Sequence, residues 1–339
     1  MKLPELLAPA GNAETAVAAY EAGADAVYCG LGKFNARERA ENFTPETLGK
    51  VLEFARSKGR KLYLTLNTLI KENELPQVME YLGELVKLSP DALIVQDPGV
   101  VQLVKEYFPQ LVLHGSTQMG IHNSAGVAAA AAMGLKRVIL ERQLTLEELR
   151  KIAAVSTVEL EVFVHGSLCC SLSGRCLLSS YMGGWSGNRG KCKQPCRRAW
   201  QTANGEEFAL SPKDLYGLDL VSEFAQMGIA SLKIEGRLRS PDYVWKTVRA
   251  YRMMLDALPE TPRKVREEAE QLLRSTATRN PSLGFYSGRN WKTLLDTKRI
   301  GAFGTASAQV EKVTSKGIMV RTLNRLHLGD RLRLVPPDG

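Results

Sequence analysis

The 339-residue sequence has little that would place it in a membrane or a secretory pathway. The nearest approach to a long apolar run, 125–134, is short and rich in alanine, which excludes a membrane span there. The N-terminal residues 1–7 lack a charged head followed by an apolar core, so we predict no signal peptide. No internal repeat or low-complexity tract stands out. These absences predict a cytoplasmic protein with no membrane partner.

Cysteine is scarce outside a single segment. Of the six cysteines, only Cys29 lies outside residues 169–196. Cys29 is on a predicted strand, and a buried, inert thiol is its simplest interpretation. In a reducing cytosol, clustered cysteines are more often metal ligands or redox groups than disulfides. The segment 169–196 is therefore the place where chemistry is expected.

The charge balance is moderately basic, with 45 Lys and Arg against 36 Asp and Glu, a net charge of +9 and a pI near 9.2. The cysteine segment carries part of this excess, and Trp185 and Trp200 flank it. Its basic residues are Arg175, Arg189, Lys191, Lys193, Arg197 and Arg198. Two interpretations remain open, a solvated basic loop and a surface that acidic ligands or RNA phosphates approach.

Short β-rich segments alternate with amphipathic helical stretches along most of the chain. The eight strand candidates are Glu5–Pro9, Ala24–Cys29, Lys61–Asn67, Ala92–Asp97, Val112–His114, Arg137–Glu141, Glu159–His165 and Ala230–Glu235. Helical patterns between and after them include 14–21, 45–57, 76–87, 145–155, 242–257 and 261–276, and the fourth begins with the capping box Thr145-x-x-Glu148. Strict alternation predicts a parallel sheet covered by helices, and eight units predict an α/β fold of the (β/α)8 TIM-barrel type.

Polar residues stand at the ends of the predicted strands. They are Asn67, Asp97, His114 with Gln118, Glu141 with Arg142, His165, and Glu235 with Arg237. In a barrel these positions converge at the C-terminal mouth, where barrel enzymes keep their sites. The cysteine segment follows the seventh strand, and its long connection would lie over that mouth.

The pattern changes near residue 301, where Ser307–Val313, Ile318–Thr322 and Arg331–Val335 alternate like short antiparallel strands. We therefore predict a catalytic barrel over residues 1–280, followed by a linker and small β module over 281–339. The abrupt stop at Gly339 predicts that the natural protein is longer.

The cysteine spacing favours a metal centre. Cys169 and Cys176 form a C-x6-C pair, and Cys192 and Cys196 form a C-x3-C pair after fifteen intervening residues. Zinc thiolates usually come in two close pairs, whereas the corners of a 4Fe–4S cube tolerate irregular spacing. Three interpretations of the cysteine segment remain open: an iron–sulfur cluster, which the spacing favours most, a zinc ion, and no metal. Side chains of adjacent residues point in different directions, so Cys170 is expected to be either a neighbour of the metal ligands or an idle thiol, not a ligand itself.

A catalytic cysteine is the rival interpretation. His165 lies four residues before Cys169, and His114 would face it across the mouth, so a Cys–His pair is conceivable. Four clustered thiols are more than a hydrolase needs.

At this point the sequence resembles the collagenase-like U32 "peptidases" over about residues 3–255. The family signature reads Glu161-x-Phe163-x2-Gly166-Ser167-Leu168-Cys169-x4-Gly174-x-Cys176-x-Leu178-Ser179. Further family marks are Glu5-Leu-Leu-Ala-Pro-Ala-Gly11, Gly23-Ala-Asp-Ala-Val-Tyr28, Ser116-Thr-Gln118, Ser211-Pro-Lys-Asp-Leu215 and Leu232-Lys-Ile-Glu-Gly-Arg237. The resemblance implies a (β/α)8-type barrel, in agreement with the strand count.

Despite the peptidase name, the bacterial members this chain resembles insert oxygen into RNA bases. The resemblance implies hydroxylation of a tRNA wobble uridine or a 23S rRNA cytidine, with prephenate and a 4Fe–4S cluster and without O2. The loop Ser186-Gly-Asn-Arg-Gly-Lys-Cys192 is similar to this RNA-hydroxylase branch. Another branch works as a heterodimer on quinones, so a dimer or related partner subunit stays open. A peptidase and a non-catalytic RNA-binding scaffold are the alternative functions.

The resemblance also implies roles for individual residues. The cluster ligands carry over onto Cys169, Cys176, Cys192 and Cys196. Prephenate is a dicarboxylate, so Arg142, Lys233 and Arg237 are expected to bind it, unless they are structural ion-pair partners. Asn67, Asp97, Gln118 and Arg175 are further substrate-binding candidates, and His165, His114 and Glu235 are the candidates for proton transfer. Tyr181, Trp185 and Trp200 would stack on an extruded base or serve as packing anchors.

Overall fold

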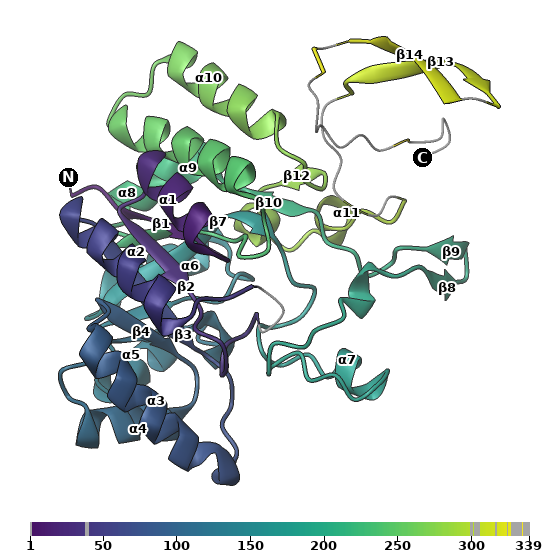
Figure 1. Cartoon of the computed structure of the whole chain (residues 1–339). Helices are drawn as coiled ribbons and strands as arrows, with labels where there is room; N and C mark the ends of the chain where they lie inside the picture. Colours follow the sequence, from purple (N-terminus) through teal and green to yellow (C-terminus); the bar gives the residue numbers. More distant parts are fainter. Residues whose placement is uncertain are drawn as a thin grey trace.

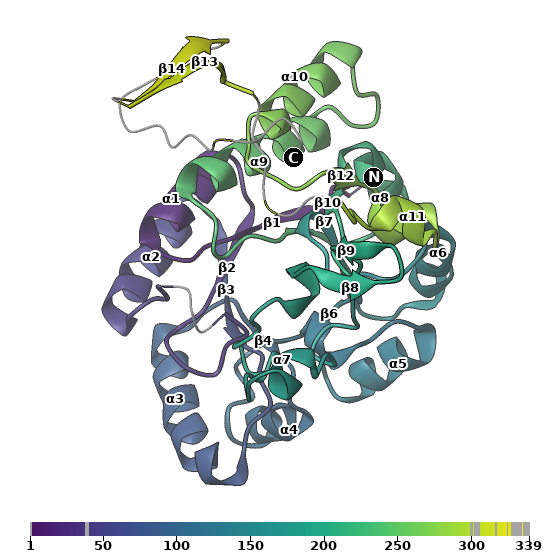
Figure 2. The ribbon, with the colours of Figure 1, turned by 90° about the vertical axis from the view of Figure 1, so that its right-hand side faces the viewer.

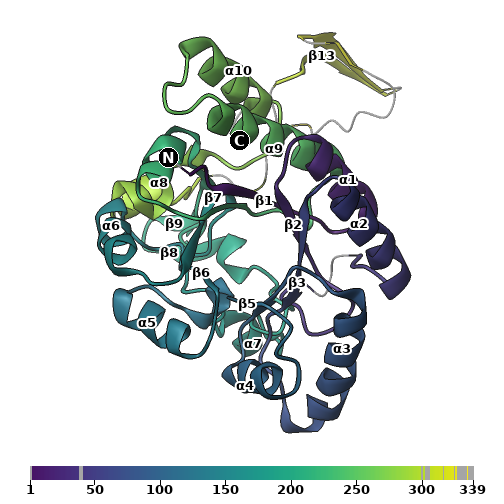
Figure 3. The same ribbon diagram turned by 90° about the vertical axis from the view of Figure 1, so that its left-hand side faces the viewer.

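Eight parallel strands close into a barrel in the computed structural model, which describes residues 2–37, 41–298, 301, 306–315, 317–323, 325–326 and 334. The barrel strands are β1 (Glu5–Pro9), β2 (Ala26–Cys29), β3 (Lys61–Leu66), β4 (Ala92–Val95), β5 (Leu113–Gly115), β6 (Arg137–Ile139), β7 (Glu159–Ser167) and β11 (Ser231–Ile234). Each pairs with the next, and β11 closes the circle by pairing with both β7 and β1. Figure 3 shows the ring of strands end-on. The predicted TIM-type barrel is confirmed.

Helices surround the barrel wall, as the alternating pattern predicted (Figure 2). They are α1 (Ala13–Glu21), α2 (Pro45–Ser57), α3 (Leu75–Leu88), α4 (Pro98–Tyr107), α5 (Ser124–Ala132), α6 (Leu146–Val155), α8 (Val221–Gln226) and α9 (Pro241–Asp256), with α10 (Arg263–Arg274) packed on α9. Thr145 and Glu148 form the predicted capping box. Short 3-10 turns occupy Glu72–Glu74, Thr117–Met119 and Leu218–Leu220. None of the helices in the described ranges combines the length and apolar character that crossing a membrane requires.

A chain of buried ion pairs fills part of the barrel interior. Glu161 on β7 is fully buried and accepts from Lys233 of β11 at 2.9 Å and from Arg137 of β6 at 3.1 Å. Arg137 also pairs with Glu5 of β1 at 2.6 Å. Inward-facing positions of four different strands supply these side chains, so the network ties the barrel together across its interior. We call Glu5, Arg137, Glu161 and Lys233 the interior ion network.

Strand β7 holds both ends of the cysteine loop, residues 168–213. Its first part pairs with β11, and its last three residues pair antiparallel with β10 (Asp214–Tyr216), with Ser167 opposite Asp214. The Arg279 guanidinium donates to the Ser167 hydroxyl at 3.0 Å and to the Asp214 carboxylate at 3.1 Å. Gly166 at this branch point has φ +103°, and a Cβ there would lie 2.7 Å from the carbonyl oxygen of Glu235. Only glycine satisfies both conditions.

The cysteine loop lies over the end of the barrel in Figure 2 and projects from it in Figure 1. It contains the short helix α7 (Leu178–Tyr181), a 3-10 turn at Pro195–Arg197, and a hairpin of β8 (Trp200–Thr202) and β9 (Gly205–Glu207). Sequence periodicity did not predict the hairpin, because each of its strands has only three residues.

The chain continues past α10 with more structure against the barrel. β12 (Pro281–Ser282) pairs with β10, and a 3-10 turn (Gly284–Ser287) and α11 (Trp291–Leu294) follow. The Tyr286 hydroxyl donates to the Phe163 carbonyl of β7 at 2.8 Å. Beyond these lies the antiparallel hairpin of β13 (Ala308–Thr314) and β14 (Gly317–Thr322), two of the three module strands that the sequence predicted. The third, 331–335, falls outside the described residues except for Leu334.

Candidate functional site

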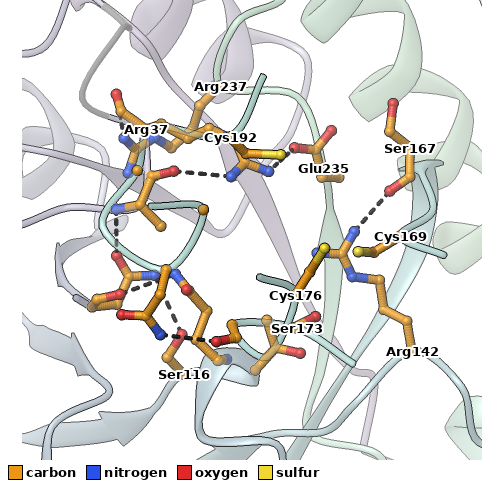
Figure 4. Close-up of a pocket in the computed structure, with 18 of the residues that line it drawn as sticks. Arg37, Ser116, Arg142, Ser167, Cys169, Ser173, Cys176, Cys192, Glu235 and Arg237 are labelled. Atoms are coloured by element: carbon orange, nitrogen blue, oxygen red, sulfur yellow. Dashed lines mark hydrogen bonds and ion pairs between the residues drawn. The ribbon is translucent and has the colours of Figure 1, made fainter. Parts of the chain in front are cut away.

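A cavity of about 230 Å³ opens at the barrel mouth, between the ends of the strands and the cysteine loop (Figure 4). Residues from both regions line it. Lys233 and Glu235 come from the end of β11, Arg142 follows β6, and Asn67 follows β3. All four predicted ligand cysteines, Cys169, Cys176, Cys192 and Cys196, line the same cavity.

The cysteine thiols lie close enough to influence one another. Hydrogen bonds link the Cys170 thiol to Cys169 and Cys196, so of its two expected roles, a neighbour of the ligands or an idle thiol, the first agrees with the structure. These bonds, aided by the Arg142 charge at Cys169 and the Arg197 charge at Cys196, lower the pKa of Cys169 to about 6 and of Cys196 to about 7. Burial raises the pKa of Cys176.

Cys192 shows how the loop would stabilise a ligating sulfur. The Gln194 amide donates to the Cys192 Sγ at 3.3 Å, and the Ser179 hydroxyl donates to it at 3.8 Å. Hydrogen bonds to cysteine sulfur are one of the means by which proteins tune iron–sulfur clusters.

The four candidate ligand cysteines line one cavity without forming a ready metal site. Among the described residues, no group of three or more Cys, His, Asp or Glu side chains is placed so that it could hold a metal ion. A tetrahedral zinc site needs four ligands about 2.3 Å from one centre, whereas a 4Fe–4S cluster binds one thiolate at each of four separate irons. Four cysteines match either donor set in number and type.

Arg142 and Arg237 supply the cavity with positive charge that no carboxylate bonds directly. Arg142 donates to the Ser167 carbonyl at 2.7 Å and stacks 4.4 Å from the Phe163 ring. Arg237 donates to the Thr65 hydroxyl at 2.7 Å and to Asn35, and burial lowers its pKa to about 10. Each guanidinium retains a buried Nε with no partner among the described residues. The same holds for Arg252 and Arg279 outside the cavity, so this feature does not by itself mark a ligand site.

Lys233, buried on β11, and Glu235, half-buried just after that strand, are already paired. Lys233 binds Glu161 and lies 4.1 Å from the Tyr28 ring centroid. Glu235 accepts from Arg37 at 3.0 Å (Figure 4). Burial alone would raise the pKa of Glu235, but the charges of Arg37 and Arg142 outweigh it and hold the pKa below its ordinary value. Glu235 is therefore a carboxylate at neutral pH.

Arg37 is a cavity residue that sequence reasoning missed. It lies in the connection between β2 and α2, where no periodic pattern or strand end marked it. Its contact with Glu235 joins residues 198 positions apart, so only the closed barrel reveals it.

Asn67 and Gln118 line the cavity as predicted. Asn67 accepts from the Ala36 amide at 3.0 Å and donates to the Ser116 hydroxyl at 3.3 Å. Gln118 donates to the Asn67 carbonyl at 2.9 Å. These bonds fix the polar wall opposite β11.

Two other predicted substrate-binding residues lie elsewhere. Asp97 does not line the cavity, because its carboxylate caps α4 by accepting from the amides of Gly99 and Val100. Arg175 is exposed outside the cavity, with a long contact of 3.4 Å to the Met119 carbonyl. A strand-end position therefore does not by itself place a side chain in the mouth.

Neither predicted histidine lines the cavity, which corrects the expectation that both face the mouth. The β7–β11 register shifts between Lys233 and Ile234, so His165 pairs with Ile234 and turns outward to Tyr243 and Tyr251 of α9. Its pKa falls to about 4 because burial disfavours the imidazolium.

His114 lies inside the barrel, 4.9 Å from the Tyr63 ring centroid. Burial and the Arg137 charge lower its pKa to about 3. Both imidazoles are therefore neutral, packed groups near neutral pH.

Comparison with known proteins places this fold and site in one family. The profile of Peptidase family U32 matches residues 11–295. The "tRNA hydroxylation protein P1" of Bacillus subtilis is 37% identical over 302 residues, covering 85% of this chain and 72% of that protein. An uncharacterized protease of Methanocaldococcus jannaschii is 40% identical over 76% of this chain and 66% of its own length.

The name of a third relative refers to a different RNA. The "23S rRNA 5-hydroxycytidine C2501 synthase" of Escherichia coli is 36% identical over 263 residues, covering 76% of this chain and 40% of that protein. The matched part of the chain thus spans from less than half to about three quarters of these relatives' lengths. With matches of this extent and identity, the chain belongs to Peptidase family U32.

Proposed function

We propose that this protein is an iron–sulfur RNA hydroxylase that adds oxygen to a base of tRNA or 23S rRNA with prephenate as cosubstrate and without O2. The observation that carries the proposal is the convergence of four cysteines, four arginines and one ionised carboxylate on a single cavity at the barrel mouth. The names of relatives that modify tRNA and 23S rRNA support the choice of RNA as the substrate.

In this proposal Cys169, Cys176, Cys192 and Cys196 hold a 4Fe–4S cluster, which would supply an electron-transfer centre when bound. Arg142 and Arg237 line the cavity and bind the carboxylates of a small dianion through their guanidinium groups. Glu235 is held ionised by Arg37, so it is ready to accept a proton from a substrate atom in the cavity.

A peptidase is the alternative that one observation favours. The pKa of Cys169 near 6 makes it a thiolate at neutral pH, as a cysteine nucleophile requires. The same geometry weakens this interpretation, because His165 and His114 both lie outside the cavity and no imidazole of the described residues pairs with Cys169. A non-catalytic RNA-binding scaffold would leave the ionised Glu235 without a role.

The test combines nucleoside mass spectrometry with metal analysis. Total tRNA and ribosomal RNA from a strain lacking the gene should lose one hydroxylated nucleoside, and the wild-type gene should restore it. Protein purified without oxygen should contain about four irons per chain, as expected for one such cluster. Unchanged nucleosides together with casein cleavage by the purified protein would overturn the proposal in favour of the peptidase.

A further inference from the structure

The outer tip of the cysteine loop exposes several aromatic and aliphatic side chains. Tyr181, the last residue of α7, is 91% exposed, Leu177 is 74% exposed and Trp185 is 42% exposed. Met182 between them is also exposed. Large apolar side chains gathered in this way on a surface usually mark a site of interaction. We call residues 177–185 the loop tip.

The segment that carries the loop tip has charge of one sign in its own sequence, and Glu74 from outside it pairs with Arg189. No Asp or Glu occurs between residues 162 and 205, whereas six Lys and Arg do. Lys193 extends across the tip with its Nζ 3.9 Å from the Trp185 ring centroid, and Arg198 is exposed on the same loop. A surface of stacking rings with cations and without carboxylates suits a polyanion that carries flat, apolar faces.

The loop tip is continuous with the cavity wall. Ser179, in the middle of α7, lines the cavity and accepts from the Lys193 amide at 3.1 Å. Asn188, Gly190 and Cys192 of the same loop line the cavity too. A ligand bound at the loop tip therefore lies beside the cavity, because Ser179 belongs to both the loop tip and the cavity wall.

We propose that the loop tip is the docking surface for a single-stranded RNA segment, whose bases stack on Tyr181 and Trp185 while its phosphates contact Lys193 and Arg198. This inference rests on the proposed function and adds to it the surface that presents the target base to the cavity. A protein partner or a second copy of this chain would match the apolar side chains but not the absence of acidic residues.

The probe is a fluorescein-labelled anticodon stem-loop RNA, titrated with the whole protein and followed by fluorescence anisotropy. Tyr181→Ala and Trp185→Ala should each raise the Kd about tenfold, since stacking of one base contributes about that factor or more. Lys193→Gln and Arg198→Gln should each flatten the slope of log Kd against log salt by about 0.7, the value for one phosphate of a single strand.

Matched controls lie at the far side of the barrel. Tyr107→Ala removes an exposed ring at the end of α4, and Arg263→Gln removes an exposed cation of α10. Both should leave the Kd and the salt slope unchanged. Circular dichroism and iron content should match the wild type in every variant, so that a loss of binding reports the surface and not the fold.

Three results would overturn the docking surface: loop-tip variants that bind as the wild type does, controls that lose affinity equally, and a wild-type dimer that Tyr181→Ala converts to monomer with RNA binding unchanged. The proposed function fails separately. If loop-tip variants restore the missing nucleoside fully, the surface is wrong and the hydroxylase stands. If the loop tip binds RNA but deletion changes no nucleoside, the surface stands and the hydroxylase is wrong.

Discussion

The interior ion network and the cysteine loop use positive charge in opposite ways. In the network, Arg137 and Lys233 are matched by Glu5 and Glu161 within 3.1 Å, and all four side chains are largely buried. The loop has no Asp or Glu in the sequence from 162 to 205, but Arg189 pairs with Glu74 and Arg197 is buried and donates to the Leu168 carbonyl. The difference teaches that the first set of charges holds the barrel together, whereas the second set includes exposed cations, Lys193 and Arg198, that a ligand can reach.

The largest effect is expected at the loop. Cys169→Ser should reduce iron from about four per chain to near zero and abolish the hydroxylated nucleoside, because a cluster needs all its thiolate ligands. Circular dichroism should stay unchanged, since the barrel closes through β7 and β11 without the loop.

The matched control for that experiment is the neighbouring thiol. Cys170→Ser removes a thiol that contacts Cys169 but is not among the cavity-lining residues, and it should retain most of the iron. Equal iron loss in both variants would show that the choice of four ligands is wrong.

The second effect concerns the interior ion network. Glu161→Gln leaves two buried cations without their shared carboxylate, so the free energy of unfolding should fall by about 3–5 kcal/mol. Urea unfolding followed by circular dichroism measures it. Glu147→Gln, which breaks an exposed pair with Lys151 on α6, should not shift the urea midpoint measurably. Similar midpoints for the two variants would remove the distinction between the two regions.

A smaller effect is expected where the two regions meet at the cavity. Arg142→Gln removes a guanidinium with an unpartnered Nε, and should raise the apparent KM for prephenate about tenfold to a hundredfold with little change in stability. Arg137→Gln, in contrast, should lower stability first. A KM that responds equally to both changes would mean that the cavity and the network are not separate.

The smallest effect separates the regions by pH. His165 has its pKa lowered to about 4 in the folded protein, against about 6.5 when unfolded, so the unfolded state takes up the proton first. Stability should therefore fall as pH drops from about 6.5 towards 4, with about 1–2 kcal/mol lost by pH 5 through His165 and a similar loss through His114, whose pKa is lowered to about 3. His165→Phe should remove about half of this dependence in urea unfolding at pH 7 and 5. An unchanged slope would mean that His165 is not the group responsible.

Much of this molecule could be predicted from sequence. All eight barrel strands lie where apolar β-rich segments predicted them, because each strand must be buried on both faces and carries that pattern locally. The convergence of Cys169, Arg142 and Glu235 at one mouth followed from the same topology.

The remainder depended on contacts between distant residues. The register shift opposite Lys233 turned His165 outward, and no single-strand pattern shows such a shift. The Asp97 carboxylate caps the N-terminus of α4, the helix that follows it, and so does not reach the cavity. The pairing of Glu161 with Arg137 and Lys233, and of Arg37 with Glu235, arises only when the barrel closes.

The pairing of Ser167 with Asp214 has a practical consequence for engineering this scaffold. The two ends of the cysteine loop, residues 168–213, meet at one strand pair, and Arg279 bonds both of them. The loop therefore leaves and rejoins the barrel at a single attachment point. Exchanging residues 168–213 for the corresponding loop of another family member should therefore leave the barrel strands intact.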